Sequence, residues 1–148
     1  GKSAGHQGRR HHRLHIDALA RFVKPGQIVI QMGEEIDRRD PWSVAAFQTH
    51  DIMAAATDAQ GRKLQLVVLP EPEEPRIKTD DFVSSYVNDY VCNGAVIAAE
   101  FDDEDADEEA EEILHTLYPG REVVMLKIDP VGEVGGGIHC ATHEQPKV

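Results

Sequence analysis

The sequence predicts a mixed α/β fold in which short strands and longer helices alternate within one domain. Apolar runs rich in β-branched residues are bounded by Gly, Pro and Asn-Gly turn signals, as is typical of strands. Between these runs lie stretches whose apolar residues recur at helical spacing. A length of 148 residues is enough for one domain with a modest core.

The first part of the chain is predicted to contain a strand, a helix and a second strand. Residues 27–32 are apolar and β-rich. Asp40 precedes a proline, which is the pattern of a helix N-cap followed by Pro at the first helical position, and the helix is expected to end near residue 56. A turn at 58–61 then leads into a buried strand at 64–69.

The second part is predicted to form two strands, a helix and a third strand. Residues 82–87 and 95–99 are the two strands, with a hairpin turn at Asn93-Gly94 before the second. Residues 102–117 are the clearest helix, because their apolar residues share one face and acidic residues crowd the first turns. A strand at 122–128 completes the unit, and a weakly similar unit ends near residue 69.

Composition and charge exclude several classes of protein. A net charge of -12 argues against nucleic-acid binding, which needs clustered Lys and Arg. No apolar run approaches the roughly 20 residues of a membrane span. The two cysteines, Cys92 and Cys140, are expected to be reduced thiols in a cytoplasmic protein. The acidic run at 102–105 is interpreted as a capped helix start, and the His-rich residues before Leu14 as a solvated tail, so no metal site is predicted.

Two short motifs at opposite ends of the chain carry candidate chemistry. Cys140 follows the run Gly135-Gly136-Gly137, and a thiol presented in this way is a candidate nucleophile. His15 and Asp17 are two residues apart, which would put them on one side of an extended strand as a proton carrier and a cation anchor. Each motif alone also fits a structural role: a buried cysteine, a glycine turn, or a capped turn with surface His and Asp.

Taken together and in order, the motifs resemble those of the agmatine deiminase and bacterial (Porphyromonas-type) peptidylarginine deiminase family. His15-Ile16-Asp17 is similar to the family's Gly-His-(Ile/Val)-Asp motif, although Leu14 replaces the glycine. The segment from Ser85 to Gly94 is similar to Ser-Tyr-(Ile/Val)-Asn-Phe-Tyr and likewise ends in Asn-Gly. The segment from Ile138 to Pro146 is similar to the closing Ile-His-Cys-Xaa-Thr-Gln-Gln-Gln-Pro motif, with His143 and Glu144 in place of amides.

The resemblance implies a pentein-type α/β propeller built from ββαβ repeats, of which this chain holds only the C-terminal ones. Residues 15–148 would be the C-terminal part of the deiminase domain. Residues 1–14 are expected to be a disordered or aberrant segment, either natural or the product of a frameshift or truncation. An incomplete propeller leaves strand edges exposed, so a homo-oligomer is a further expectation.

The resemblance also implies the chemistry. Cys140 would attack the guanidinium carbon, His15 would move protons, and Asp17 would hold the guanidinium with a partner carboxylate upstream. The three glycines, 135–137, would give the backbone room beside the substrate, and no metal or organic cofactor is implied.

The expected substrate is a small guanidinium cation, either agmatine or the side chain of a peptidyl arginine. Conversion of agmatine to N-carbamoylputrescine and ammonia is the leading expectation, and a non-catalytic fragment that binds cations or a partner is the alternative from a different class. His139 is expected to point away from Cys140 because neighbours on a strand face opposite ways. Arg21 and Trp42 are expected to serve packing or the surface, and Cys92 the core.

Overall fold

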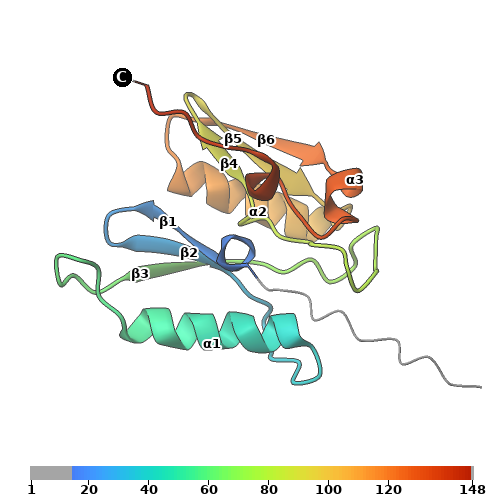
Figure 1. Cartoon of the computed structure of the whole chain (residues 1–148), viewed down its shortest axis with the longest axis horizontal. Coiled ribbons are helices and arrows are strands. Elements are labelled where there is room, and N and C mark those ends of the chain that lie inside the picture. The colour runs from blue at the N-terminus through green and yellow to red at the C-terminus, as the bar shows by residue number, and fades with distance from the viewer. Residues whose placement is uncertain (1–14, 148) are drawn as a thin grey trace, which may run out of the picture.

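The computed structural model describes residues 15–147, which form two three-stranded sheets and their helices (Figure 1). The first unit contains β1 (Ala20–Lys24), β2 (Gln27–Gln31), α1 (Pro41–Ala55) and β3 (Gln65–Leu69). The second unit contains β4 (Tyr90–Cys92), β5 (Ala95–Glu100), α2 (Glu104–Leu117) and β6 (Glu122–Lys127). Three short turns complete the described chain: η1 (Ile16–Ala18), α3 (Asp129–Gly132) and η2 (His139–Ala141).

The two units have the same topology. In the first, β1 and β2 pair antiparallel, and the chain crosses through α1 so that β3 pairs parallel with β2. In the second, β4 and β5 pair antiparallel, and the crossover through α2 puts β6 parallel to β5. The prediction of a repeated ββαβ unit is therefore confirmed. A propeller would need further repeats and stays a prediction.

Both crossover helices begin directly after an aspartate whose side chain caps the backbone N–H groups of the first turn. The Asp40 carboxylate accepts hydrogen bonds from the N–H groups of Trp42 at 2.9 Å and Ser43 at 3.3 Å. The Asp103 carboxylate caps α2 by accepting from the N–H of Ala106 at 3.4 Å. Because capping depends on residues next to each other in the chain, both helices lie close to their predicted ranges, and α2 starts two residues later than expected.

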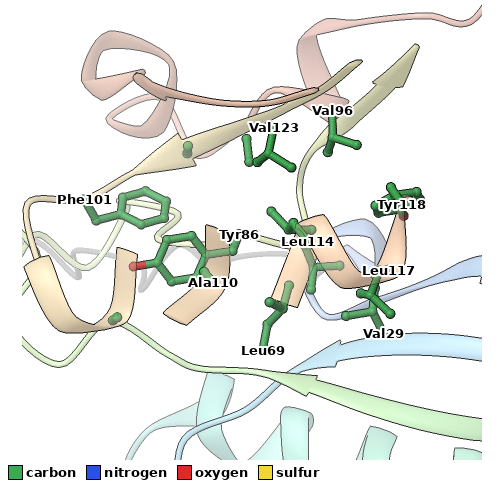
Figure 2. Close-up of a cluster of buried hydrophobic side chains, with 14 residues drawn as sticks. Val29, Leu69, Tyr86, Val96, Phe101, Ala110, Leu114, Leu117, Tyr118 and Val123 are labelled. Atoms are coloured by element: carbon green, nitrogen blue, oxygen red, sulfur yellow. The ribbon is translucent and has the colours of Figure 1, made fainter. Parts of the chain in front are cut away.

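One buried cluster joins the two units. Figure 1 shows α2 between the two sheets and α1 on the outer side of the first sheet. Figure 2 shows Leu114 and Leu117 of α2 facing Leu69 and Val29 of the first unit, and all four side chains are buried. This apolar layer fixes the first unit against the second.

The strand predicted at 82–87 is not formed. Residues 84–89 are an irregular segment, and the strand that pairs with β5 is β4, directly before the hairpin turn. The turn itself is confirmed, since Gly94 has a φ of 84°. Side chains of the first unit satisfy the backbone of the irregular segment: Gln31 donates to the Ser84 carbonyl at 2.7 Å and accepts from the Tyr86 N–H at 2.6 Å.

Within residues 15–147, no helix is both long and apolar enough to cross a bilayer. The expectations about the first fourteen residues lie outside the described part of the chain.

Candidate active site

The two ends of the described chain meet at the carboxylate of Asp17. One of its oxygens, Oδ2, accepts hydrogen bonds from the His139 Nδ1 at 2.8 Å and from the Cys140 Sγ at 3.3 Å. The η1 turn carries Asp17, and the η2 turn carries the two residues that contact it. The structure thus brings together Asp17 and Cys140, which lie near opposite ends of the chain and which the resemblance implied as parts of one site.

His139 is part of this cluster, and the prediction that it points away from Cys140 is wrong. The prediction assumed a strand, in which neighbouring side chains face opposite ways. His139–Ala141 is instead a 3₁₀ turn, in which neighbours are about a third of a turn apart. Both side chains therefore reach the same carboxylate.

Asp17 also occupies a turn and not the expected strand. His15 is extended, with φ -93° and ψ 140°, and directly precedes the 3₁₀ turn Ile16–Ala18. Its side chain is exposed, and its charge is one of those that lower the pKa of Asp17. It nevertheless lines the same cavity as Asp17 and Cys140.

This cavity has a volume of about 200 Å³ and collects acidic and aromatic side chains. Besides the residues above, its walls include Trp42, Asp80 and Asp81. Trp42 was expected to serve packing, and the two aspartates had not been expected at the site at all. They precede the segment that resembles the family, and only the fold of residues 79–85 brings them beside Cys140.

The groups around Asp17 hold its carboxylate in the ionised form. Burial on its own would raise the pKa of Asp17, but the hydrogen bonds from His139 and Cys140 and the charges of His139 and His15 outweigh it and lower the pKa. The second oxygen, Oδ1, is buried and has no hydrogen-bond partner among the described residues. The carboxylate is therefore ionised at neutral pH and keeps one acceptor oxygen unused.

Asn88 forms hydrogen bonds to the turn His139–Ala141, which carries Cys140, and the sequence did not single it out. Its Oδ1 accepts from the backbone N–H of His139 at 2.9 Å and of Cys140 at 3.3 Å, and its Nδ2 donates to the Cys140 Sγ at 3.3 Å. The side chain is 1% exposed. Asn88 belongs to the segment from Ser85 to Gly94 that resembles the family, but it is one of several polar residues there and its partners are distant in sequence.

The three glycines before Cys140 divide between two roles. Gly135 lines the cavity and has a φ of +81°, a conformation that favours glycine. Gly137 is buried against Asn88, where an added Cβ would lie 2.6 Å from the Asn88 Cγ. Gly136 has only ordinary contacts around it. Gly135 thus borders the cavity, whereas Gly137 leaves room for Asn88, and a substrate contact of the glycines stays a prediction.

Arg21 was expected to serve packing or the surface, and in the structure it forms an ion pair with the buried Asp89. Its Nη1 also donates to the Asp89 carbonyl at 2.7 Å. Burial raises the pKa of Asp89 to about 7, against the opposing charges of Arg21 and His139. Cys92 is half-buried and not fully in the core, with its Sγ 3.6 Å from the Ala95 carbonyl oxygen.

The described residues contain no group of three or more His, Cys, Asp or Glu side chains that could hold a metal ion. The cavity is lined by a thiol, a carboxylate and the imidazole of His15, and a second imidazole, that of His139, bonds to the carboxylate. A thiolate is a nucleophile, and an imidazole can give or take a proton near neutral pH.

Several known proteins are similar to this chain over most of its length. A Latilactobacillus sakei protein, provisionally named an agmatine deiminase, is 37% identical over 89% of this chain and 40% of its own length. The agmatine deiminase of Medicago truncatula is 32% identical over 90% of the chain and 40% of its own length. Among solved structures, the agmatine deiminase of Enterococcus faecalis matches with a TM-score of 0.79 and 28% identity, over 90% of this chain and 40% of that one.

The chain thus spans about 40% of the length of the curated relatives that it matches. A sequence profile for the Porphyromonas-type peptidyl-arginine deiminases matches residues 3–146, nearly the whole chain. The chain belongs to the Porphyromonas-type peptidyl-arginine deiminase family.

Proposed function

We propose that this chain supplies the nucleophile and part of the substrate clamp of a deiminase, which hydrolyses a guanidinium group to a ureido group and ammonia. The observation that carries the proposal is the shared carboxylate: Asp17 contacts the Cys140 sulfur beside a cavity that His15 also lines. A guanidinium held by that carboxylate would have its central carbon next to the thiol.

The charged carboxylate of Asp17 would hold the substrate. A guanidinium is a planar cation whose N–H groups form a fork that matches a carboxylate. The lowered pKa of Asp17 keeps the carboxylate charged, and its Oδ1 has no other partner among residues 15–147. Asp80 and Asp81 add negative charge around the same cavity, and an upstream carboxylate, as the resemblance implies, would complete the clamp.

Two displacement steps then account for the reaction. The Cys140 thiolate attacks the guanidinium carbon, forming a C–S bond, and a C–N bond breaks as ammonia leaves with a proton from His15. His15 next takes one proton from water as the oxygen attacks the same carbon, the C–S bond breaks, and the second proton of the water passes from the oxygen to the solvent. The ureido product leaves and the thiolate is restored, without a metal or organic cofactor.

Agmatine is the substrate that the relatives favour, since several of them carry the name agmatine deiminase. Its product would be N-carbamoylputrescine, a precursor of putrescine. Peptidyl arginine is the second candidate, because the family description names it. Both present the same guanidinium, and the two differ only in the groups at the far end of the aliphatic chain that bears it.

The test compares a cationic and a neutral reagent of the same shape on the 148-residue chain. Chloroacetamidine mimics a guanidinium, whereas chloroacetamide alkylates any accessible thiol. We expect the ratio of the two alkylation rates, read by peptide mass spectrometry, to be higher at Cys140 than at Cys92. We expect Asp17→Asn to lower the ratio at Cys140 only, and agmatine or an arginine peptide to protect it.

Equal ratios at the two cysteines would contradict a guanidinium clamp in this chain and support the non-catalytic alternative. In the whole protein, ammonia release from agmatine and from an arginine peptide would decide between the two substrates. Cys140→Ala is expected to abolish that release while leaving the circular dichroism unchanged, and retained turnover would remove Cys140 from the mechanism.

A further inference from the structure

We propose that Asn88 is a further residue of this active site, which fixes the turn that carries Cys140 and donates a hydrogen bond to its sulfur. The inference rests on the proposed function for its biological meaning. Its evidence is geometric, because every polar atom of the Asn88 side chain faces the nucleophile or the turn that presents it.

The first part of the role is positional. The Oδ1 of Asn88 accepts from two successive backbone N–H groups, those of His139 and Cys140, and the Asn88 carbonyl accepts from the His139 N–H at 3.1 Å. These bonds set the amide's orientation, since a reversed amide would point its NH₂ at two donors. The NH₂ must therefore face the sulfur.

The second part of the role is electrostatic. The Asp17 carboxylate lies 3.3 Å from the Cys140 sulfur and would repel a thiolate before any cation is bound. The Asn88 Nδ2, at the same distance, is a donor that favours the ionised sulfur. Asn88 thus opposes the effect of Asp17 on the nucleophile, and it does so without occupying the cation site.

The surroundings of Asn88 make this arrangement rigid. Ser85, three residues earlier, donates to the Ala18 carbonyl at 2.8 Å, next to Asp17, and accepts from the Asn88 N–H at 3.3 Å. Gly137 packs against the amide so closely that a Cβ would lie 2.9 Å from the Asn88 Cβ. Segment 84–89 therefore ties the Asp17 turn of the first unit to the Cys140 turn at the end of the chain.

The experiment measures the rate of Cys140 alkylation by iodoacetamide from pH 6 to pH 10 in the 148-residue chain. Asn88→Leu keeps the side-chain size and removes the donor and the acceptor. We expect its rate at pH 7 to fall about tenfold, because a hydrogen bond to a charged group is worth about that factor. Near pH 10, where thiols ionise without help, we expect the rates to converge.

Two controls separate this effect from loss of structure. Gln31→Met removes another buried amide that bonds to the same segment but does not touch the sulfur, so we expect lower thermal stability with an unchanged pH profile. Cys92, alkylated in the same sample, is the internal reference. If Asn88→Leu does not fold, Gly137→Ala displaces the amide instead and is expected to shift the profile in the same direction.

A folded Asn88→Leu with the wild-type pH profile at Cys140 would overturn the proposal. A slower rate at every pH, with no convergence, would also count against the hydrogen bond to the thiolate. Iodoacetamide is neutral and needs no guanidinium clamp, so this result is independent of the chloroacetamidine test. Either proposal can therefore fail while the other stands.

Discussion

A single residue, Asp17, shows how much of this site depends on one carboxylate. Its Oδ2 bonds to an imidazole and a thiol from a turn that lies at the far end of the sequence, while its Oδ1 has no partner among the described residues. One carboxylate oxygen therefore joins the imidazole and the thiol, and in the proposed function the same carboxylate would hold the cation. We expect residues that adjust its neighbours, such as Asn88, to matter as much as the carboxylate itself.

Asp89 gives a prediction about pH at the scale of a residue. Burial raises its pKa from 3.8 to about 7 in the folded protein, so the folded state holds a proton that the unfolded state releases at lower pH. The stability that this group contributes is complete below about pH 4 and is lost as the pH rises toward 7. Asp89→Asn removes the titration.

The measurement is the thermal midpoint of the wild type and of Asp89→Asn at pH 5.0 and pH 7.5. We expect the midpoint of the wild type to fall relative to that of the variant between the two values. Comparing two pH values separates the titration of Asp89 from the pH-independent cost of removing its ion pair with Arg21. A difference that grows in favour of the wild type as pH rises would show that the ion pair, not burial, dominates.

At the scale of elements, the helix caps are predicted to differ in strength. The hydrogen bonds to the Asp40 carboxylate come from the first turn of α1. Asp103 caps α2 and also accepts from the N–H groups of Glu73 at 2.8 Å and Glu74 at 2.9 Å in the preceding loop. Asp40→Ala should cost about 1 kcal/mol, the usual value of an N-cap. Asp103→Ala should cost more, because it also releases the loop before the second unit.

Urea unfolding of the two alanine variants measures both costs. Asp40→Asn and Asp103→Asn are the matched controls, since asparagine caps a helix nearly as well as aspartate. Equal losses for the two alanine variants would mean that the bonds from Asp103 to the preceding loop contribute nothing to stability.

The elements that the sequence predicts well are those specified by neighbouring residues. Asp40 with Pro41 and Asp103 with its acidic first turn carry their own capping signals, and Asn93-Gly94 carries its own turn. The strand predicted at 82–87 was wrong because the partners of segment 84–89, among them Gln31, are distant in sequence. Apolar alternation cannot reveal that a side chain from another unit will satisfy the backbone.

The site follows the same division. The resemblance drew attention to Asp17 and Cys140, which do meet. It could not predict the 3₁₀ turn that orients His139 toward the same carboxylate. Nor could it predict the packing of Gly137 on Asn88. Those contacts form because two turns that are distant in sequence pack against segment 84–89, and that packing exists only in the folded chain.

At the scale of the whole molecule, we expect the isolated chain to self-associate. Both sheets have open edges among the described strands, and Phe22 on β1 and Leu126 on β6 are 57% and 44% exposed. Unpaired strand edges with apolar side chains favour pairing with another chain. Light scattering over a tenfold range of concentration should give a rising mass, and a concentration-independent monomer would contradict the expectation.

The shared core predicts that the two units unfold together. Leu114 on α2 belongs to the cluster that also contains Val29 and Leu69 of the first unit (Figure 2), whereas Trp42, the only tryptophan, reports on the first unit from α1. Leu114→Ala should cost about 2–5 kcal/mol, the usual range for a buried leucine. Because both units contribute to this buried cluster, the substitution in the second unit should lower two unfolding midpoints equally. These are the midpoint measured by Trp42 fluorescence and the midpoint measured by circular dichroism.

The matched control is Leu126→Ala, which makes the same substitution at a side chain that is 44% exposed on β6. We expect it to move neither midpoint by more than a small fraction of the Leu114→Ala effect. If Leu114→Ala instead lowers the circular-dichroism midpoint and leaves the Trp42 transition in place, the units are separable. The contact between Asp17 and Cys140, which come from different ends of the described chain, would then have to be held by segment 84–89 alone and not by the core.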